Sequence, residues 1–137
     1  MKPLITAAFF AALATLTLHA QDLQVTATIP FDFHVCNRVM PSGKYVIRSE
    51  GSALLLSDEG PSGAKCLASP RSAFDPNGAQ PAKLVFRRYG SDYFLRTIWG
   101  GFSADGKELP VERQERALLA QSKRNGPKPT ILALAAK

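Results

Sequence analysis

The chain has 137 residues, of which 45% are hydrophobic and 20% charged, and its formal charge at pH 7 is +6. This length suits one domain with a single core, and the composition excludes a globally disordered chain. The N-terminus stands apart, because Lys2 precedes an uncharged run over residues 4–18 that ends near the small residue Ala20. We therefore predict a signal peptide over residues 1–20, cleaved after Ala20, and a single β-rich domain over residues 21–137.

A membrane anchor is the alternative for this N-terminal run. The run over residues 4–18 is shorter than the roughly 20 apolar residues that cross a bilayer, and no later apolar run is longer, so we expect no transmembrane segment in the mature chain. Gln21, not a cysteine, follows the predicted cleavage site, so lipidation is not expected. We expect an exported protein, periplasmic or secreted, whose formal charge is +5 once Lys2 is removed.

Apolar residues occupy alternate positions from Leu23 to Val35, with polar residues and Pro30 between them. This period of two is typical of a half-buried strand, and either one long strand or two short ones satisfies it. Pro30 lacks a backbone donor, which favours a sheet edge or a bulge at that point. The same alternation places His34 on the polar face, where we expect a solvent-exposed side chain.

Short strands separated by turns are predicted after this segment. The sequence Met-Pro-Ser-Gly at 40–43 predicts a turn before a strand over 44–48, and the turn at 50–52 precedes an apolar run over 53–56. The following segments are predicted to be a loop over 58–63, a short strand over 64–69 and a longer loop over 70–81, rich in Pro, Asn and Gly.

A β-hairpin over residues 83–99 is the strongest local signal. Residues 83–89 and 92–99 are rich in aromatic and β-branched side chains, as strands prefer, and Gly90-Ser91 lies between them. Glycine at the first central position suits the positive φ of a type II′ turn. We therefore predict two antiparallel strands joined by a two-residue turn.

The hydrophobic period changes after a break at Gly100-Gly101 and a predicted turn over 104–107. A helix is predicted over 111–124, with Pro110 before it and Asn-Gly-Pro at 125–127 after it. Its apolar stripe consists of Val111, Leu118 and Leu119.

The last apolar run, over residues 130–135, is predicted to be a closing strand that pairs back onto the sheet. Many short strands followed by one late helix indicate a mainly β protein. The expected architecture is a small β-sandwich or a partly open β-barrel, with the helix packed across one side or end.

Several stretches of the mature chain carry a resemblance to a known group of proteins. They are Ile29-Pro30-Phe31-Asp32-Phe33, Pro41-Ser42-Gly43-Lys44-Tyr45, Leu84-Val85-Phe86-Arg87-Arg88-Tyr89-Gly90 with Tyr93-Phe94-Leu95 and Trp99, and Glu108-Leu109-Pro110 before residues 112–116. On these motifs the chain resembles short, uncharacterised secreted proteins from acidobacteria, over most of its mature length. The resemblance implies export and β architecture, and it implies no activity.

Cys36 and Cys66 are the two cysteines of the chain. An even number of cysteines in an oxidising compartment favours one disulfide, which would close a loop of about thirty residues and stabilise the fold by roughly 3 to 4 kcal/mol. Two free thiols are the alternative, and the sequence leaves both open. By the resemblance, Cys36 stands where a glycine is expected before Asn37, so a disulfide would be a feature of this chain in particular.

Catalytic and metal-binding motifs are not evident in the mature chain. His34 is its single histidine, and its spacing from the two cysteines does not match a zinc site, so no metal and no cofactor are expected. A nucleophilic pair of Cys36 with His34 is disfavoured, because the two residues have opposite phase in a strand. Candidate acids for hydrolysis are Asp92, Asp105, Glu108 and Glu112, and exposed surface acids are the simpler interpretation.

Arginines alternate with aromatic residues on the predicted hairpin. Arginine beside aromatic rings is the combination that grips anionic or sugar-bearing ligands by charge, hydrogen bonds and stacking. The six candidate binding residues are Arg87, Arg88, Arg96, Tyr89, Tyr93 and Trp99; Phe94 lies between them in the sequence but is not one of the six. The simpler interpretation is that the aromatic side chains belong to the core and the arginines are solvated.

The leading hypothesis is an exported, non-catalytic β domain that serves as a binding or structural module of the cell envelope. Its expected partner is an anionic envelope polymer or another protein, and not nucleic acid, which an exported protein does not normally meet. The alternatives are a small hydrolase that uses the acids near residues 105–112, and a barrel that binds an apolar small ligand.

Overall fold

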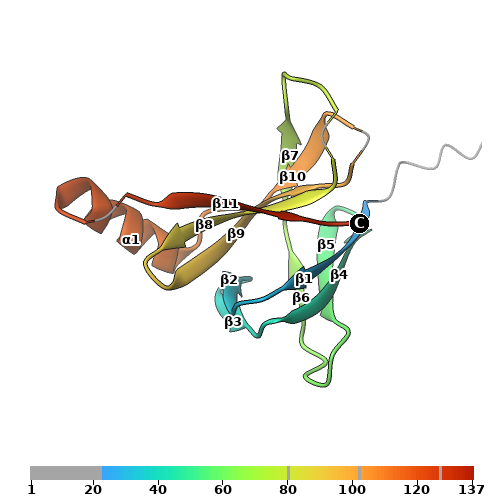
Figure 1. Ribbon diagram of the computed structural model, residues 1–137, viewed down its shortest axis with the longest axis horizontal. Coiled ribbons are helices and arrows are strands. Elements are labelled where there is room, and N and C mark those ends of the chain that lie inside the picture. The colour runs from blue at the N-terminus through green and yellow to red at the C-terminus, as the bar shows by residue number, and fades with distance from the viewer. Residues whose placement is uncertain (1–22, 80, 102, 127) are drawn as a thin grey trace, which may run out of the picture.

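The computed structural model describes residues 23–137 except 80, 102 and 127, so the predicted signal peptide and its cleavage site lie outside the described residues. The described residues form two β-sheets, with one helix at the end of the molecule (Figure 1). The elements in chain order are β1 (Gln24–Ile29), β2 (Phe33–Val35), β3 (Arg38–Met40), β4 (Gly43–Glu50), β5 (Ala53–Asp58), β6 (Lys65–Ala68), β7 (Arg71–Phe74), β8 (Lys83–Tyr89), β9 (Asp92–Trp99), β10 (Asp105–Glu108), α1 (Arg113–Arg124) and β11 (Thr130–Ala135). The prediction of a mainly β protein with one C-terminal helix is confirmed.

Sheet A is a four-stranded antiparallel sheet with the order β1-β4-β5-β6. In β1, Val25, Ala27 and Ile29 are buried while Gln24 and Thr28 are exposed, as the alternation predicted. The alternating segment resolves into two strands, β1 and β2, because the first strand ends before Pro30, which lacks a backbone donor.

Sheet B has the order β11-β8-β9-β10-β7, and β2 joins it by pairing with β9 in parallel and with β3 in antiparallel orientation. The predicted pairing of 130–135 back onto the sheet is confirmed, with β11 antiparallel to β8. Lys137, just after β11, exchanges two backbone hydrogen bonds of 2.9 Å with Thr26 of β1, so the C-terminus ties sheet B to sheet A at one corner.

The two sheets face each other across one apolar core. Phe33 links them, since its ring lies edge to face with Tyr45 of sheet A at 5.1 Å and with Phe86 of sheet B at 5.8 Å. Each such fully buried side chain contributes roughly 1.5 to 3 kcal/mol. In the described part of the chain the sheets do not close into a barrel, so the architecture is that of a small sandwich.

Two predictions about loops were wrong. Residues 71–74, predicted within a loop, form β7, and residues 105–108, predicted mostly as a turn, form β10. These two strands pair with each other, from Asp105 opposite Phe74 to Glu108 opposite Arg71. Neither has an apolar alternation, so their strand structure comes from pairing between distant segments, which local sequence does not show.

The hairpin prediction is confirmed. β8 and β9 pair from Lys83 opposite Trp99 to Tyr89 opposite Asp92, with a register shift after Val85. Gly90 has a φ of 62°, the positive value that the first position of a type II′ turn requires.

The helix is also confirmed, but it begins at Arg113, two residues later than predicted. Val111 precedes its first residue, and Leu118 and Leu119 are only half-buried. Its one fully buried residue is Glu115. Glu115 is buried because it faces Tyr89 and Arg96 of the β8–β9 hairpin.

Candidate functional site

The helix α1 packs against the face of the β8–β9 hairpin that points away from sheet A, here called the outer face. Tyr89 and Phe94 are buried on this face, with their rings edge to face at 5.6 Å, and they do not belong to the apolar core between the sheets. The outer face therefore contains a second, smaller interior, covered by α1 at Tyr89 and by the ring of His34 at Phe94.

Glu115 of α1 is the centre of this second interior and is 1% exposed. It accepts a hydrogen bond of 3.2 Å from the hydroxyl of Tyr89. Its two carboxylate oxygens each lie 3.8 Å from a guanidinium nitrogen, one from Arg87 and one from Arg96. Burial and the neighbouring Glu115 raise the pKa of Tyr89, so its hydroxyl stays protonated and donates a hydrogen bond to the carboxylate.

Arg96 connects this network to the chain segment between β10 and α1. Its Nη1 donates to the carbonyl of Leu109 at 2.8 Å, and its Nη2 donates to Oε1 of Glu108 at 3.1 Å. Glu108 accepts a further bond of 3.3 Å from Nε of Arg71. Arg96 is only 5% exposed, so it acts as an internal anchor for this segment.

The six predicted binding residues do not form one surface. Arg87, Tyr89 and Arg96 meet at Glu115 under the helix. Arg88 lies 5.4 Å above the ring of Tyr93, whose other neighbour is Phe31, stacked at 3.8 Å.

Trp99, the sixth of them, covers the backbone of Gly106 at the opposite end of β9, where a Cβ would stand 2.6 Å from its ring. Ligand binding by these six residues stays a prediction, and any ligand would meet them at separate places.

The candidate acids are also dispersed. Glu108 binds two arginines, Asp105 is exposed on β10, and Asp92 lies 3.4 Å from Nε2 of His34. The expectation that His34 is exposed was wrong, since its side chain is 11% exposed and its ring stacks on Phe94 at 4.4 Å. Among the described residues there is no cluster of His, Cys, Asp or Glu that suits a metal ion.

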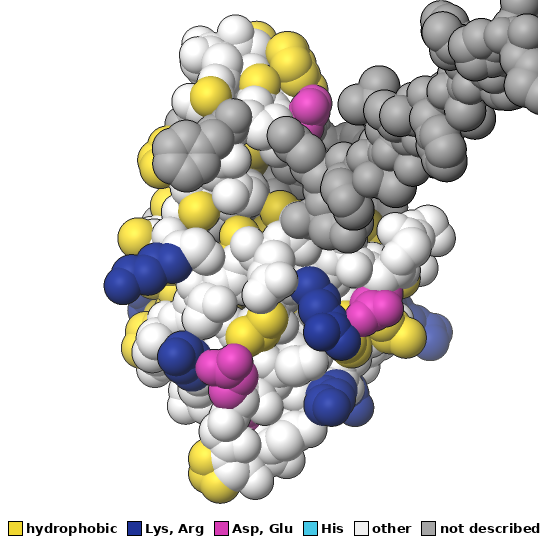
Figure 2. Space-filling model, turned by 90° about the vertical axis from the view of Figure 1, so that its right-hand side faces the viewer, with side chains coloured by type: hydrophobic (Ala, Val, Ile, Leu, Met, Phe, Trp, Pro, Cys, Tyr) yellow, Lys and Arg dark blue, Asp and Glu magenta, His cyan; other side chains and the backbone are white. Residues whose placement is uncertain are grey.

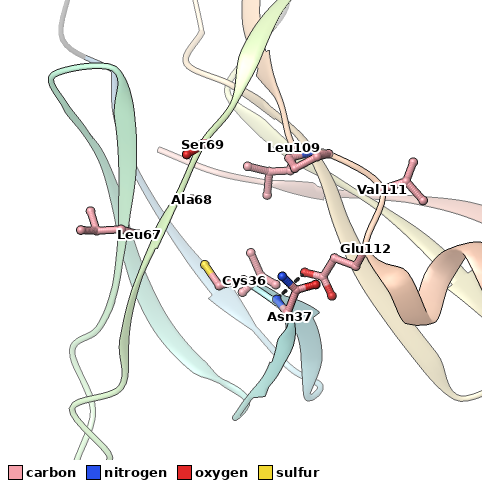
Figure 3. Close-up of a pocket in the computed structure, with 10 residues that line it drawn as sticks. Cys36, Asn37, Leu67, Ala68, Ser69, Leu109, Val111 and Glu112 are labelled. Carbon is pink, nitrogen blue, oxygen red and sulfur yellow. Dashed lines mark hydrogen bonds between the residues drawn. The ribbon is translucent and has the colours of Figure 1, made fainter.

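A groove lies where the two sheets and the segment before α1 meet (Figure 3). It has a volume of about 310 Å³. Its walls are residues 67–69 at the end of β6, residues 109–112 before α1, and the turn between β2 and β3. A neighbouring hollow, with Arg71 and Arg116 at its walls, continues it along the helix.

Glu112 and the turn between β2 and β3 hold the groove together. The backbone N–H of Asn37 donates to Oε1 of Glu112 at 3.1 Å, the contact drawn in Figure 3. Burial in the groove raises the pKa of Glu112. Cys36 also lines the groove, and neither it nor Cys66 is in a disulfide. Sequence reasoning missed this groove, since its walls come from three distant segments.

The exposed face of α1 carries positive charge. Arg113, Arg116, Lys123 and Arg124 are all exposed, and at 100° per residue they fall within an arc of about 100°. The helix's single acid, Glu115, is buried on another side. None of these four cations forms an ion pair with an acid in the described part of the chain.

The side of the molecule away from α1 is different. Figure 2 shows basic and acidic side chains next to one another there, on a surface that is mostly neutral. Strand β4 makes two ion pairs, Lys44 with Glu59 and Arg48 with Glu50. The four cations of α1, in contrast to Lys44 and Arg48, have no acid partner among the described residues.

Comparison of the chain with protein-family models, with curated proteins and with solved structures gave no match. Within residues 23–137, apart from the three that are not described, no helix has the length and apolar character needed to span a membrane. The fold and the surface define the class: a two-sheet β protein with a small groove and a cationic helix face.

Proposed function

We propose that the protein is exported and serves as a non-catalytic binding module of the cell envelope, with an anionic polymer as its ligand. The observation that supports this proposal is the cationic face of α1, where four exposed basic side chains lie together without an acid partner in the described part of the chain. A polymer with regularly spaced carboxylates or phosphates contacts several such charges at once. The buried network around Glu115 holds this helix on the sheet.

This proposal moves the binding surface from the hairpin to the helix. Arg96 already donates hydrogen bonds to the carbonyl of Leu109 and to Glu108, and Arg87 lies beside the carboxylate of Glu115. The alternative of a small hydrolase finds no support in the dispersed acids, and a barrel around an apolar ligand would need a closed barrel, which the two sheets do not form.

Binding to a defined polymer tests the proposal. The purified protein is titrated with polygalacturonate, a carboxylate polymer, and with neutral dextran as the uncharged control, at low and high salt. We expect binding to polygalacturonate only, weakening as salt rises because exposed ionic contacts are screened. Salt-independent binding, or equal binding to dextran, would contradict a cationic site.

A matched pair of variants locates the site. In the first variant, four cations of α1 become glutamine: Arg113, Arg116, Lys123 and Arg124. In the control, four other exposed cations become glutamine: Lys44, Arg48, Lys65 and Lys137. Both lose four charges. If each of four exposed contacts contributes about 0.5 kcal/mol, the Kd for polygalacturonate should rise roughly thirtyfold in the first variant and change little in the control. Equal weakening in both would show that net charge alone acts.

Export is tested separately. The gene is expressed in a bacterium, and the mass of the protein in the periplasm and medium is measured. We expect a chain that begins at Gln21. Recovery of the chain from the cytoplasm with residues 1–20 intact would contradict export.

A further inference from the structure

Cys36 and Cys66 come together from different sheets. Cys36 lies in the turn between β2 and β3 of sheet B and lines the groove, while Cys66 lies in β6 of sheet A and is 8% exposed. The sulfur of Cys36 points toward β6 (Figure 3), and the two thiols are within hydrogen-bonding reach. The fold therefore brings together two thiols that are far apart in the sequence, and one of them, Cys36, lines the groove.

The backbone at Cys36 is unusual. Cys36 and Asn37 have φ values of 55° and 57°, the pattern of a type I′ turn, in which both central residues are left-handed. Asparagine suits this conformation, but cysteine does not. Strained residues of this kind persist where the surroundings fix them, and they are frequent at functional sites. A glycine here would fold with less strain but would provide no thiol.

The two thiols are not equivalent. Hydrogen bonding from Cys66 lowers the pKa of Cys36, with the positive charge of Arg38 acting in the same direction. The same hydrogen bond, together with burial, raises the pKa of Cys66. Because the thiolate is the nucleophile in disulfide exchange, Cys36 is the thiol prepared to react, and it is the one that lines the groove.

We propose that Cys36 and Cys66 are a reversible thiol–disulfide pair, in which Cys36 exchanges with a small-molecule disulfide that enters the groove and Cys66 resolves the mixed disulfide. The pair does not depend on the anionic ligand proposed for α1. Its product is a covalent link between the two sheets, beside the segment that leads to the helix.

The exchange proceeds in two balanced steps. The Cys36 thiolate attacks one sulfur of the disulfide R–S–S–R, the S–S bond breaks, and one RS⁻ leaves and takes up a proton. Cys66 then loses its proton to solvent and attacks the Cys36 sulfur, which releases the second RS⁻ to be protonated in turn. Two protein thiols are oxidised by two electrons, and one small disulfide is reduced to two small thiols.

Equilibration with glutathione tests reversibility. The purified protein is incubated at fixed ratios of oxidised to reduced glutathione, quenched by alkylation and weighed by mass spectrometry. We expect a two-state change between the dithiol and an intramolecular disulfide, with the same midpoint from either direction. The absence of the disulfide at every ratio would overturn the proposal, and so would a disulfide that reduced glutathione opens only after denaturation.

The order of reaction tests the roles. In the unaltered, reduced protein, iodoacetamide is expected to modify Cys36 at least about tenfold faster than Cys66, since each unit of pKa changes the thiolate fraction about tenfold. Cys66→Ala should accumulate a mixed disulfide with glutathione, and Cys36→Gly, which keeps the left-handed turn, should not. Equal alkylation rates, or a mixed disulfide on Cys66 in the folded Cys36→Gly protein, would overturn the assignment.

Discussion

The two faces of the β8–β9 hairpin are buried in different ways. Toward sheet A, its side chains are apolar, and Leu84, Phe86 and Ile98 are each 0% exposed. Toward α1, the buried side chains include Arg96 and Tyr89, which surround Glu115 of the helix. The first face is stabilised mainly by removal of apolar surface from water, whereas the second depends on every charge having a partner. One hairpin therefore belongs to an apolar interior and to an ionic one.

Phe86→Ala tests the apolar face and is expected to have the largest effect. The ring of Phe86 is fully buried and lies edge to face with Phe31 at 5.1 Å and with Phe33 at 5.8 Å. Its removal leaves a cavity between the sheets, which predicts a loss of about 3 to 5 kcal/mol in the free energy of unfolding. Urea denaturation measures this loss. A loss below about 1 kcal/mol would mean that the two sheets do not share this core.

Glu115→Ala tests the ionic face. This substitution removes the acceptor of the Tyr89 hydroxyl and one of the acidic neighbours of the buried Arg96. Arg96 still donates to Glu108 and to the carbonyl of Leu109. We therefore expect a loss of about 2 to 4 kcal/mol, slightly less than for Phe86→Ala.

A double-mutant cycle with Arg96→Met separates the ion pair from general damage. We expect the double variant to be more stable than the sum of the single losses predicts, by about 1 to 3 kcal/mol, because each single variant leaves an unmatched charge. Additive losses in denaturation would show that Glu115 and Arg96 do not interact.

The same contrast explains what the sequence predicts well. Alternation over 23–35 predicts the first strands, because apolar residues at period two are typical of a half-buried strand. The aromatic and β-branched content of 83–89 and 92–99 predicts the hairpin. The Gly90 turn is likewise local, since its φ of 62° suits glycine. These features need no knowledge of distant segments.

The ionic side was not predictable in this way. Glu115 looks like an exposed helix acid, and Arg96 like a ligand-binding arginine, until the helix is placed on the hairpin. β7 and β10 likewise become strands only through each other. In the groove, Cys36, residues 67–69 and Glu112 come from separate elements, so their spacing in the sequence does not predict that they lie close together.

Two buried tyrosines extend the comparison to alkaline pH. Burial raises the pKa of Tyr45, in the apolar core, to about 12, and it also raises the pKa of Tyr89 on the ionic face. An acid whose folded pKa exceeds its unfolded value of 10 stabilises the fold below pH 10 and loses that contribution as pH rises.

Tyr45→Phe is expected to cost about 1 kcal/mol at neutral pH, because its hydroxyl no longer donates to the carbonyl of Pro41. From pH 10 to about 12 its stability should fall less steeply than that of the parent protein, by up to about 1.4 kcal/mol per pH unit. Denaturation curves across this range measure the slopes. Parallel slopes would contradict burial of the Tyr45 hydroxyl, and Tyr89→Phe gives the matching test on the ionic face.

Arg88→Ala is expected to have the smallest effect and to separate the two kinds of arginine on this hairpin. Arg88 is exposed; it lies 5.4 Å from the ring of Tyr93, and its Nε donates to the carbonyl of Gly90 at 2.6 Å. Water replaces both contacts readily, so we expect a loss of about 0.5 kcal/mol, against several times more for the buried Arg96→Ala. Urea denaturation of the two variants side by side decides the point. Equal losses would mean that burial under α1 does not distinguish these arginines, and the helix would then not seal an ionic interior.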